Sequence, residues 1–298
     1  MRTLEGILGP VVTPFDASGE LDTAAFRRNI RAHLDAGLHG IVVAGSTGEA
    51  ALLDEDEREA LLEAARAEVP AERPLVAGIG AESTRVTIAR ARRAGVHGAD
   101  AVLVVAPHYY GDAMTPDALG DHYRRVADAS PVPVMLYTIP KYMHFALAPT
   151  LVQQLARHDN IVGMKDSSGD AALFREYLAA KSDTFQVLTG SGTLLGEALR
   201  MGADGAILAV ALFAPMHSLL VLAAVRDGDE DALRSAQAHL TPLASKIVAR
   251  LGVAGVKAAL DAVGLTGGPV RPPLRALDAG TLVQLGALLT TADLVPAH

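Results

Sequence analysis

Residues 160–170 read NIVGMKDSSGD, a short apolar run that ends in Lys165 and passes into a polar turn. The run is apolar on both faces and partly β-branched, which is typical of a parallel strand that helices cover on both sides. Only five lysines occur in the chain, so one that closes a buried strand is unusual. Lysine can lose its charge when it is desolvated, and the neutral amine is a nucleophile. The structural alternative is a strand-end lysine whose amine reaches water.

Seven further runs of this kind alternate with longer amphipathic segments. The eight runs cover residues 6–12, 40–44, 75–78, 101–106, 132–137, 161–164, 186–188 and 205–208. Strands that alternate with helices indicate βαβ units, and eight such units at this spacing fit a closed (β/α)₈ TIM barrel of the α/β class. An open doubly wound sheet is the alternative. It usually has fewer strands and a glycine-rich turn after the first one, where this chain reads Thr13-Pro14-Phe15.

The helical segments carry recognisable start signals. Asp22, Asp54, Ser83 and Thr115 are each placed to cap a helix, and Pro149 is placed to open another.

Beyond about residue 213 the pattern becomes purely helical. It continues to residue 225 and then through 229–251, 256–263 and 279–289. Because no polar linker divides it from the rest, we predict a single domain over residues 1–298. The barrel would occupy residues 1–225, with appended C-terminal helices over residues 226–298.

Composition excludes several classes of protein. The chain has 298 residues, of which half are hydrophobic, no cysteine, and a formal net charge of −8. Disulfides and thiolate metal sites are therefore excluded. The chain has no run of basic residues, so we expect no nucleic-acid partner. The histidines show no metal-ligand spacing, so no metal is expected. Residues 1–6 lack the apolar core of a signal peptide, and the longest apolar stretch, 206–215, is too short to span a bilayer. We predict a cytoplasmic protein without a membrane partner.

In a barrel of this type the reactive groups gather where the strands end. Tyr137 and Lys165 end neighbouring strands, and a phenol beside an amine suits imine formation with a carbonyl substrate. The second strand is followed by GSTGE at residues 45–49, where Ser46 and Thr47 suit a carboxylate or phosphate. The alternative is an ordinary glycine-rich turn.

Other polar residues have less definite roles. Tyr109 follows the fourth strand and either packs or shuttles protons, and the apolar Val210 would wall the pocket after the eighth strand. Glu49 is expected to brace its loop or to cap the next helix. The acidic residues of that helix are expected to form a solvated face; they are Glu55, Asp56, Glu57 and Glu59.

Five motifs in order make the chain resemble a known family, and RPPL at residues 271–274 adds to the likeness. They are Thr13-Pro14-Phe15, GSTGE at 45–49, PHYY at 107–110, Tyr137-x-x-Pro140 and Gly163-x-Lys165. With these motifs the chain resembles the pyruvate-dependent class I aldolases, a family that includes dihydrodipicolinate synthase and N-acetylneuraminate lyase.

The resemblance implies a lyase that uses no cofactor, because Lys165 forms a Schiff base with the 2-oxo acid substrate. It implies that Ser46 and Thr47 hold the substrate carboxylate and that Tyr137 relays protons together with Thr47. It further implies a homotetramer in which Tyr109 reaches into a neighbour's site.

Departures from the family pattern concern the second substrate. Thr138 stands where the family has asparagine, and Tyr142 stands where the synthase has a carboxylate-binding arginine. Lys141 and His144 lack the two-pronged geometry of arginine. We expect Thr138, Tyr142 and Ser168 to contact the distal part of the substrate. The leading hypothesis is cleavage or dehydration of a 2-keto-3-deoxy sugar acid. The alternatives are condensation of pyruvate with aspartate semialdehyde and a non-catalytic protein that binds 2-oxo acids.

Overall fold

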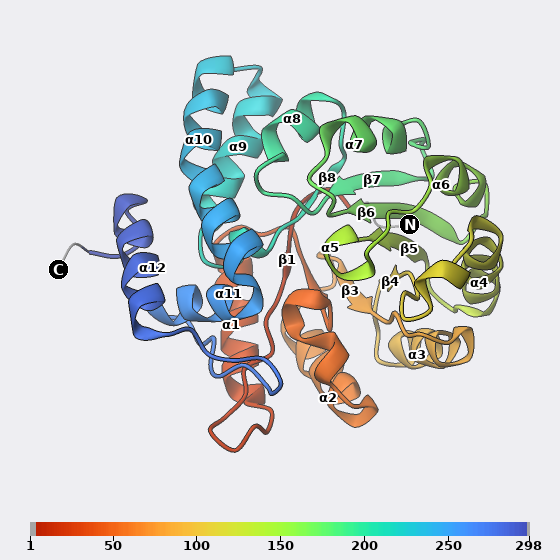
Figure 1. Cartoon of the computed structure of the whole chain (residues 1–298), viewed down its shortest axis with the longest axis horizontal. Coiled ribbons are helices and arrows are strands. Elements are labelled where there is room, and N and C mark those ends of the chain that lie inside the picture. Colours follow the sequence, from red (N-terminus) through yellow and green to blue (C-terminus); the bar gives the residue numbers. More distant parts are fainter. Residues whose placement is uncertain (1–3, 297–298) are drawn as a thin grey trace.

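A closed barrel of eight parallel strands forms the centre of the computed structural model, which describes residues 4–296 (Figure 1). Neighbouring strands pair in chain order, and β1 closes the barrel against β8. The strands are β1 (Gly6–Pro10), β2 (Gly40–Val43), β3 (Leu75–Gly78), β4 (Ala101–Val105), β5 (Val134–Thr138), β6 (Ile161–Asp166), β7 (Gln186–Thr189) and β8 (Gly205–Ile207). The predicted TIM barrel is confirmed, and all eight runs contain a strand.

Helices surround the barrel, and the predicted caps begin four of them. Asp22, Asp54, Ser83 and Thr115 each accept a hydrogen bond from the backbone N–H three residues later. The helices that follow the strands are α1 (Thr23–Asp35), α2 (Glu55–Glu68), α3 (Thr84–Val96), α4 (Pro116–Ala129), α5 (Pro140–Met143), α6 (Pro149–Leu155), α7 (Ala171–Leu178), α8 (Leu195–Arg200) and α9 (Pro215–Asp227). Pro149 is the first residue of α6, as predicted.

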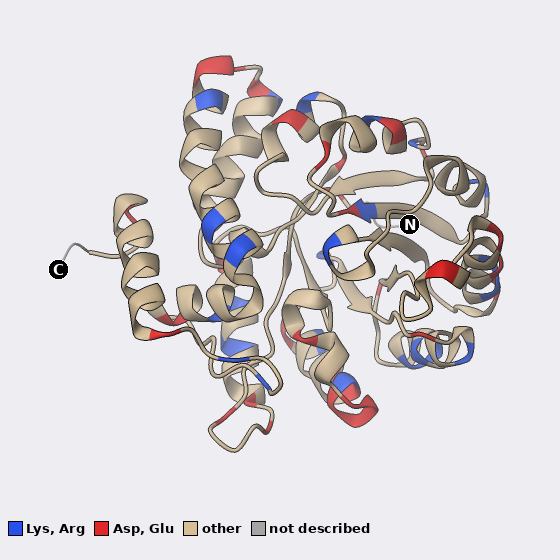
Figure 2. Ribbon diagram, in the orientation of Figure 1, with Lys and Arg blue, Asp and Glu red and all other residues tan. Residues whose placement is uncertain are grey.

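Charged residues are concentrated on the outer helices, whereas the strands carry almost none (Figure 2). The reason is burial, since nearly every strand residue is shielded from solvent by the barrel interior or by the helices. A charged side chain at a strand end is therefore exceptional, and Lys165 and Asp166 are two adjacent ones at the end of β6.

The last helices lie on one side of the barrel, where the first of them packs against α9 (Figure 1). They are α10 (Glu230–Leu243), α11 (Arg250–Ala262) and α12 (Ala279–Thr291), and the π-helical turn η5 (Ala244–Ala249) joins α10 to α11. Near the start of α11, Gly252 has φ +63° and ψ −146°, which a residue with a side chain rarely adopts. This glycine kinks the helix where it faces the carboxyl ends of the strands.

Within residues 4–296 no helix is long and apolar enough to cross a membrane. Residues 1–3, which belong to the N-terminal segment considered above, lie outside the described part of the chain.

Candidate active site

A pocket of about 420 Å³ opens at the carboxyl ends of the strands. Seven of the nine predicted site residues line it: Ser46, Thr47, Tyr137, Tyr142, Lys165, Ser168 and Val210. The other two, Thr138 and Tyr109, are not among the lining residues.

Lys165 and Tyr137 line the pocket next to each other. They are directly opposite each other in the pairing of β5 with β6, so their side chains point the same way. The Nζ atom of Lys165 lies 4.4 Å from the centre of the Tyr137 ring. Both residues are buried, with 6% and 4% of their surface exposed. The arrangement places an amine and a phenol side by side in a shielded space.

Room for the lysine comes from Gly190, the first residue after β7. A Cβ atom at this position would lie 2.8 Å from Cε of Lys165 and 2.0 Å from Oγ of Ser167. A side chain there would force Ser167 or Lys165 to shift, so the glycine is needed for packing around the lysine and not for its backbone angles.

Ser46 and Thr47 lie in η1 (Ser46–Gly48), a single 3₁₀ turn that two residues separate from the end of β2. The hydroxyl of Thr13 donates to the carbonyl of Gly48 over 2.8 Å and ties this turn to the loop that follows β1. The first N–H groups of such a turn have no acceptor within it, so they are available to an anion. We call residues 46–48 the carboxylate seat, after the role predicted for them.

Thr138 faces away from the pocket, and the predicted substrate contact of its side chain is therefore wrong. Neighbouring residues of a strand point to opposite faces, so Tyr137 turns inward and Thr138 turns toward the surrounding helices. Its hydroxyl accepts a hydrogen bond from the N–H of Leu147 over 3.2 Å. The side chain is fully buried and fixes the segment that precedes α6.

Asp166 is buried on the same outer face. Its carboxylate accepts hydrogen bonds from the N–H of Ser168 over 2.9 Å and from the Ser168 hydroxyl over 2.8 Å. Burial raises the pKa of Asp166 to about 6 despite these two hydrogen bonds. The carboxylate holds the turn after Lys165, and it also holds the Ser168 hydroxyl, so that Ser168 lines the pocket with its side chain already engaged.

Asp166→Asn should change how stability depends on pH. Because the pKa is about 6 in the folded protein against 3.8 as the ordinary value, the folded state keeps a proton that the unfolded state has lost. This stabilisation is complete below pH 3.8 and is lost as the pH rises toward 6. From about pH 4 to 6, the free energy of unfolding of the parent should fall by on the order of 2 kcal/mol relative to the variant. Urea unfolding of both proteins across this range measures the difference. The prediction would be contradicted if the free energy of unfolding depended on pH in the same way in both proteins.

Tyr109 lies outside the pocket of its own chain, with 77% of its surface exposed. Its ring packs edge-on against Tyr110 at 5.0 Å, and its backbone N–H donates to the carboxylate of Glu82 over 2.9 Å. A role in a neighbouring subunit stays a prediction.

The C-terminal helices complete the pocket wall, which the sequence patterns did not indicate. Ala244, Val248, Gly252, Val253 and Val256 all line it. Ser191 and Thr193, whose hydroxyl groups follow β7, line the pocket as well, although the sequence patterns assign them no role. The signals available were the Gly190-Ser191-Gly192 turn at a strand end and a glycine at position 252 within an otherwise helical pattern.

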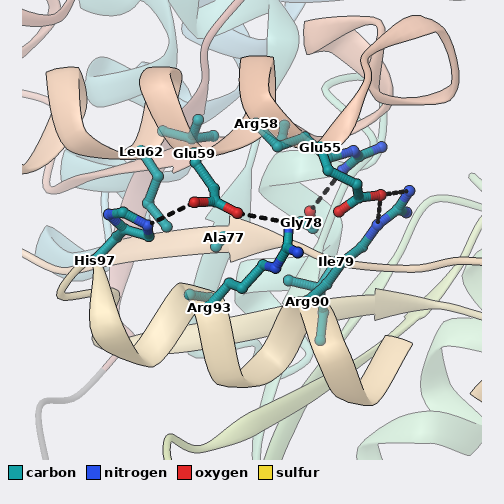
Figure 3. A pocket seen from close by; sticks show the side chains of 13 residues that line it. Glu55, Arg58, Glu59, Leu62, Ala77, Gly78, Ile79, Arg90, Arg93 and His97 are labelled. Atoms are coloured by element: carbon teal, nitrogen blue, oxygen red, sulfur yellow. Dashed lines mark hydrogen bonds and ion pairs between the residues drawn. The ribbon is translucent and has the colours of Figure 1, made fainter. Parts of the chain in front are cut away.

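A second hollow, of about 30 Å³, lies between α2 and α3 (Figure 3). Its charged side chains pair with one another: Glu55 contacts Arg90 at 2.6 Å, and Glu59 contacts Arg93 at 2.6 Å. This volume holds about one water molecule. The prediction of a solvated acidic face is confirmed for Asp56, which is exposed, and holds in part for Glu55 and Glu59, which are partly exposed but pair with α3. It is wrong for Glu57, which is largely buried and pairs with the C-terminal segment.

Comparison with known proteins places these features in context. The sequence profile of the dihydrodipicolinate synthetase family matches residues 3–292. The chain is 39% identical to a DapA-like lyase of Halobacterium salinarum, over 98% of this chain and 95% of that protein. A crystal structure of dihydrodipicolinate synthase from Bacillus anthracis matches with a TM-score of 0.94 and 30% identity, over 98% and 99% of the two chains. A prophage protein from Escherichia coli, solved in complex with pyruvate, matches with a TM-score of 0.91 and 33% identity over 98% and 99%.

Proposed function

This chain belongs to the dihydrodipicolinate synthetase family, and on that premise we propose that it is a lyase that cleaves or dehydrates a 2-keto-3-deoxy sugar acid through an imine on Lys165. One observation carries the proposal. The buried Nζ of Lys165 lies 4.4 Å from the Tyr137 ring, in a pocket that Ser46 and Thr47 also line. A nucleophile, a proton carrier and a place for a carboxylate thus share one site.

The proposed reaction begins when the neutral amine of Lys165 attacks the keto carbon C2. The carbonyl oxygen takes up two protons and leaves as water, which gives a protonated imine. In cleavage, Tyr137 accepts the proton of the C4 hydroxyl, the C3–C4 bond breaks, and its electrons enter the imine to give an enamine and an aldehyde. The enamine then takes a proton at C3, and hydrolysis of the imine releases pyruvate. In dehydration, loss of a C3 proton gives the enamine, which expels the C4 hydroxyl as water.

Seat and lysine together favour a 2-oxo acid as the substrate. The carboxylate would be held by the hydroxyls and N–H groups of the seat, while the adjacent keto carbon reaches the amine. The E. coli relative was solved with pyruvate, which is such an acid. Tyr137 and Thr47 would pass protons between the substrate oxygens and solvent.

The distal part of the pocket favours an uncharged, hydroxylated chain. Hydroxyl groups of Tyr142, Ser167, Ser191 and Thr193 are among the groups that line the pocket as a whole, and its described lining contains no arginine, histidine or acidic residue. Lys141 lines the pocket too, but its Nζ donates to the carbonyl of Ala249 over 2.7 Å. A second carboxylate is best bound by the two parallel hydrogen bonds of arginine, whereas a polyol exchanges hydrogen bonds with hydroxyls.

This assignment is tested by comparing turnover of a 2-keto-3-deoxy sugar acid with turnover of pyruvate plus aspartate semialdehyde. The parent protein should first gain a reduced pyruvyl adduct when it is incubated with pyruvate and borohydride and then weighed by mass spectrometry. It should then convert 2-keto-3-deoxygluconate at least about tenfold faster than it condenses pyruvate with aspartate semialdehyde, which corresponds to 1.4 kcal/mol.

A reversed ratio would support the synthase, the activity named for the Bacillus anthracis relative. An adduct without either turnover would support a protein that only binds 2-oxo acids. Absence of the adduct would reject the imine.

A further inference from the structure

We propose that a buried ion pair between Glu49 and Lys257 is a positioning device that fixes the carboxylate seat, residues 46–48, against helix α11. The inference rests on the proposed function, because it assumes that the seat binds the carboxylate of a 2-oxo acid. Neither residue lines the pocket, so both would act through the seat and not on the substrate itself.

Glu49 and Lys257 are in close contact in the interior of the protein. Nζ of Lys257 lies 2.5 Å from Oε1 of Glu49, and the two side chains are 1% and 0% exposed. The same Nζ donates to the carbonyl of Pro269 over 2.7 Å and lies 4.5 Å from the centre of the Phe15 ring. Removing two charges from water is costly, so an ion pair this deep is weak evidence for stability alone. A role in fixing one arrangement of the chain accounts better for it.

The backbone on either side of the seat is in an unfavourable conformation. Ala44 has φ +52° and Glu49 has φ +58°, so residues with side chains occupy the left-handed region directly before and after residues 45–48. Such positions persist only where the surroundings hold them, and they occur often at functional sites. At Glu49 the restraint is visible, since its side chain is anchored by Lys257.

A second anchor acts on the other oxygen of the same carboxylate. Oε2 of Glu49 accepts the backbone N–H of Arg271 over 2.9 Å. The Arg271 guanidinium in turn holds both oxygens of Glu57, over 2.7 Å and 2.5 Å, and donates to the carbonyl of Leu52 over 2.9 Å. Glu49 is therefore fixed by α11 and by the segment that follows it.

The same helix also forms part of the pocket wall. Val256, which immediately precedes Lys257, lines the pocket, and so does Gly252 at the kink. Through this one ion pair, the docking of α11 sets the position of the seat relative to the part of the pocket wall that α11 forms. If the seat shifts, the substrate carboxylate moves relative to Lys165, and a displacement of about 1 Å at a site of this kind can lower rates on the order of a hundredfold.

The experiment compares how tightly the seat holds pyruvate in four proteins. They are the parent, Glu49→Gln, Lys257→Met and the double variant. The concentration of pyruvate that gives half-maximal borohydride-trapped adduct is measured for each. We expect it to rise by about tenfold or more in the variants while the maximal adduct yield is kept, because a displaced seat weakens carboxylate binding before it affects the amine.

Methyl pyruvate provides a readout that general damage would not produce. Its ester carries no charge, so the seat contributes little to its binding. The concentration that gives half-maximal adduct should therefore be nearly the same in variant and parent for methyl pyruvate. For pyruvate it should be much higher in the variant than in the parent.

Lys181→Met is the matched control. Lys181 contacts Asp204 at 2.9 Å, and both residues precede their strands, at the opposite end of the barrel from the pocket. This variant should bind both ligands as the parent does.

Glu49→Gln keeps the size of the side chain and its hydrogen-bonding oxygen, and the double variant removes both charges together. These two variants can therefore still be compared with the parent if Lys257→Met does not fold. The inference is overturned if the folded variants bind pyruvate within about twofold of the parent, a difference of less than 1 kcal/mol. Equal losses for pyruvate and methyl pyruvate would overturn it as well. If the parent itself traps no pyruvate, the proposed function fails and the inference falls with it. A parent that traps pyruvate beside unaffected variants rejects the inference alone.

Discussion

Lys165→Ala should form no borohydride-trapped adduct with pyruvate and should lose more than about 10⁴-fold in kcat/KM, as expected when a covalent nucleophile is removed. The remaining pocket would still bind the carboxylate, but it would offer no amine to the keto carbon. Intact-mass spectrometry after reduction measures the adduct, and peptide mapping of the parent should locate it on Lys165.

Lys181→Ala is the control for the loss of a lysine, because this residue lies at the far end of the barrel. It should retain the adduct and the turnover. An adduct that persists in Lys165→Ala would show that another amine is the nucleophile, and Lys141 would then be the first candidate because it also lines the pocket.

Tyr137→Phe is expected to lower turnover by about 10²–10⁴-fold, the usual effect of removing a general acid or base. The phenylalanine ring keeps the packing against Nζ of Lys165, so the fold and the placement of the amine should be unchanged. The adduct should still form, but more slowly, since proton transfer is needed to expel water from the first addition product. Steady-state turnover and the time course of trapping measure the two effects.

Tyr177→Phe is the control for the loss of a buried phenol hydroxyl that has a structural role and no proposed role in catalysis. The Tyr177 hydroxyl is buried and donates to the carbonyl of Leu147 over 2.6 Å, away from the pocket. Its loss should lower the melting temperature and leave turnover close to that of the parent. Full turnover in Tyr137→Phe would mean that another group carries the proton.

The two adjacent residues Lys165 and Asp166 illustrate how one strand end serves two purposes. Lys165 points into the barrel and meets Tyr137, whereas Asp166 points outward and holds the turn that borders the pocket. The alternation of side chains along a strand separates the amine from the carboxylate, which would otherwise pair with it as an ion pair. The close pairing of a lysine with a carboxylate occurs elsewhere, between Lys257 and Glu49.

Much of the fold follows from short-range patterns in the sequence. Hydrophobic runs of strand length, helix caps such as Asp54, and the regular spacing between them each depend on a few neighbouring residues. The proximity of Tyr137 to Lys165 also follows, because parallel strands in chain order bring their carboxyl ends together. The outward position of Thr138 also follows from the sequence, because side chains alternate between the two faces of a strand and the neighbouring Tyr137 points inward.

The barrel, the strand-end lysine with its tyrosine neighbour, and the polar turn after the second strand are each encoded by residues that lie close together in the chain. The closure of the pocket by the C-terminal helices and the contact of Glu49 with Arg271, 222 residues away, are instead products of tertiary packing. No local pattern specifies such contacts. They arise only when packing brings distant segments together, and a buried charge must then find its partner among the residues that the fold supplies.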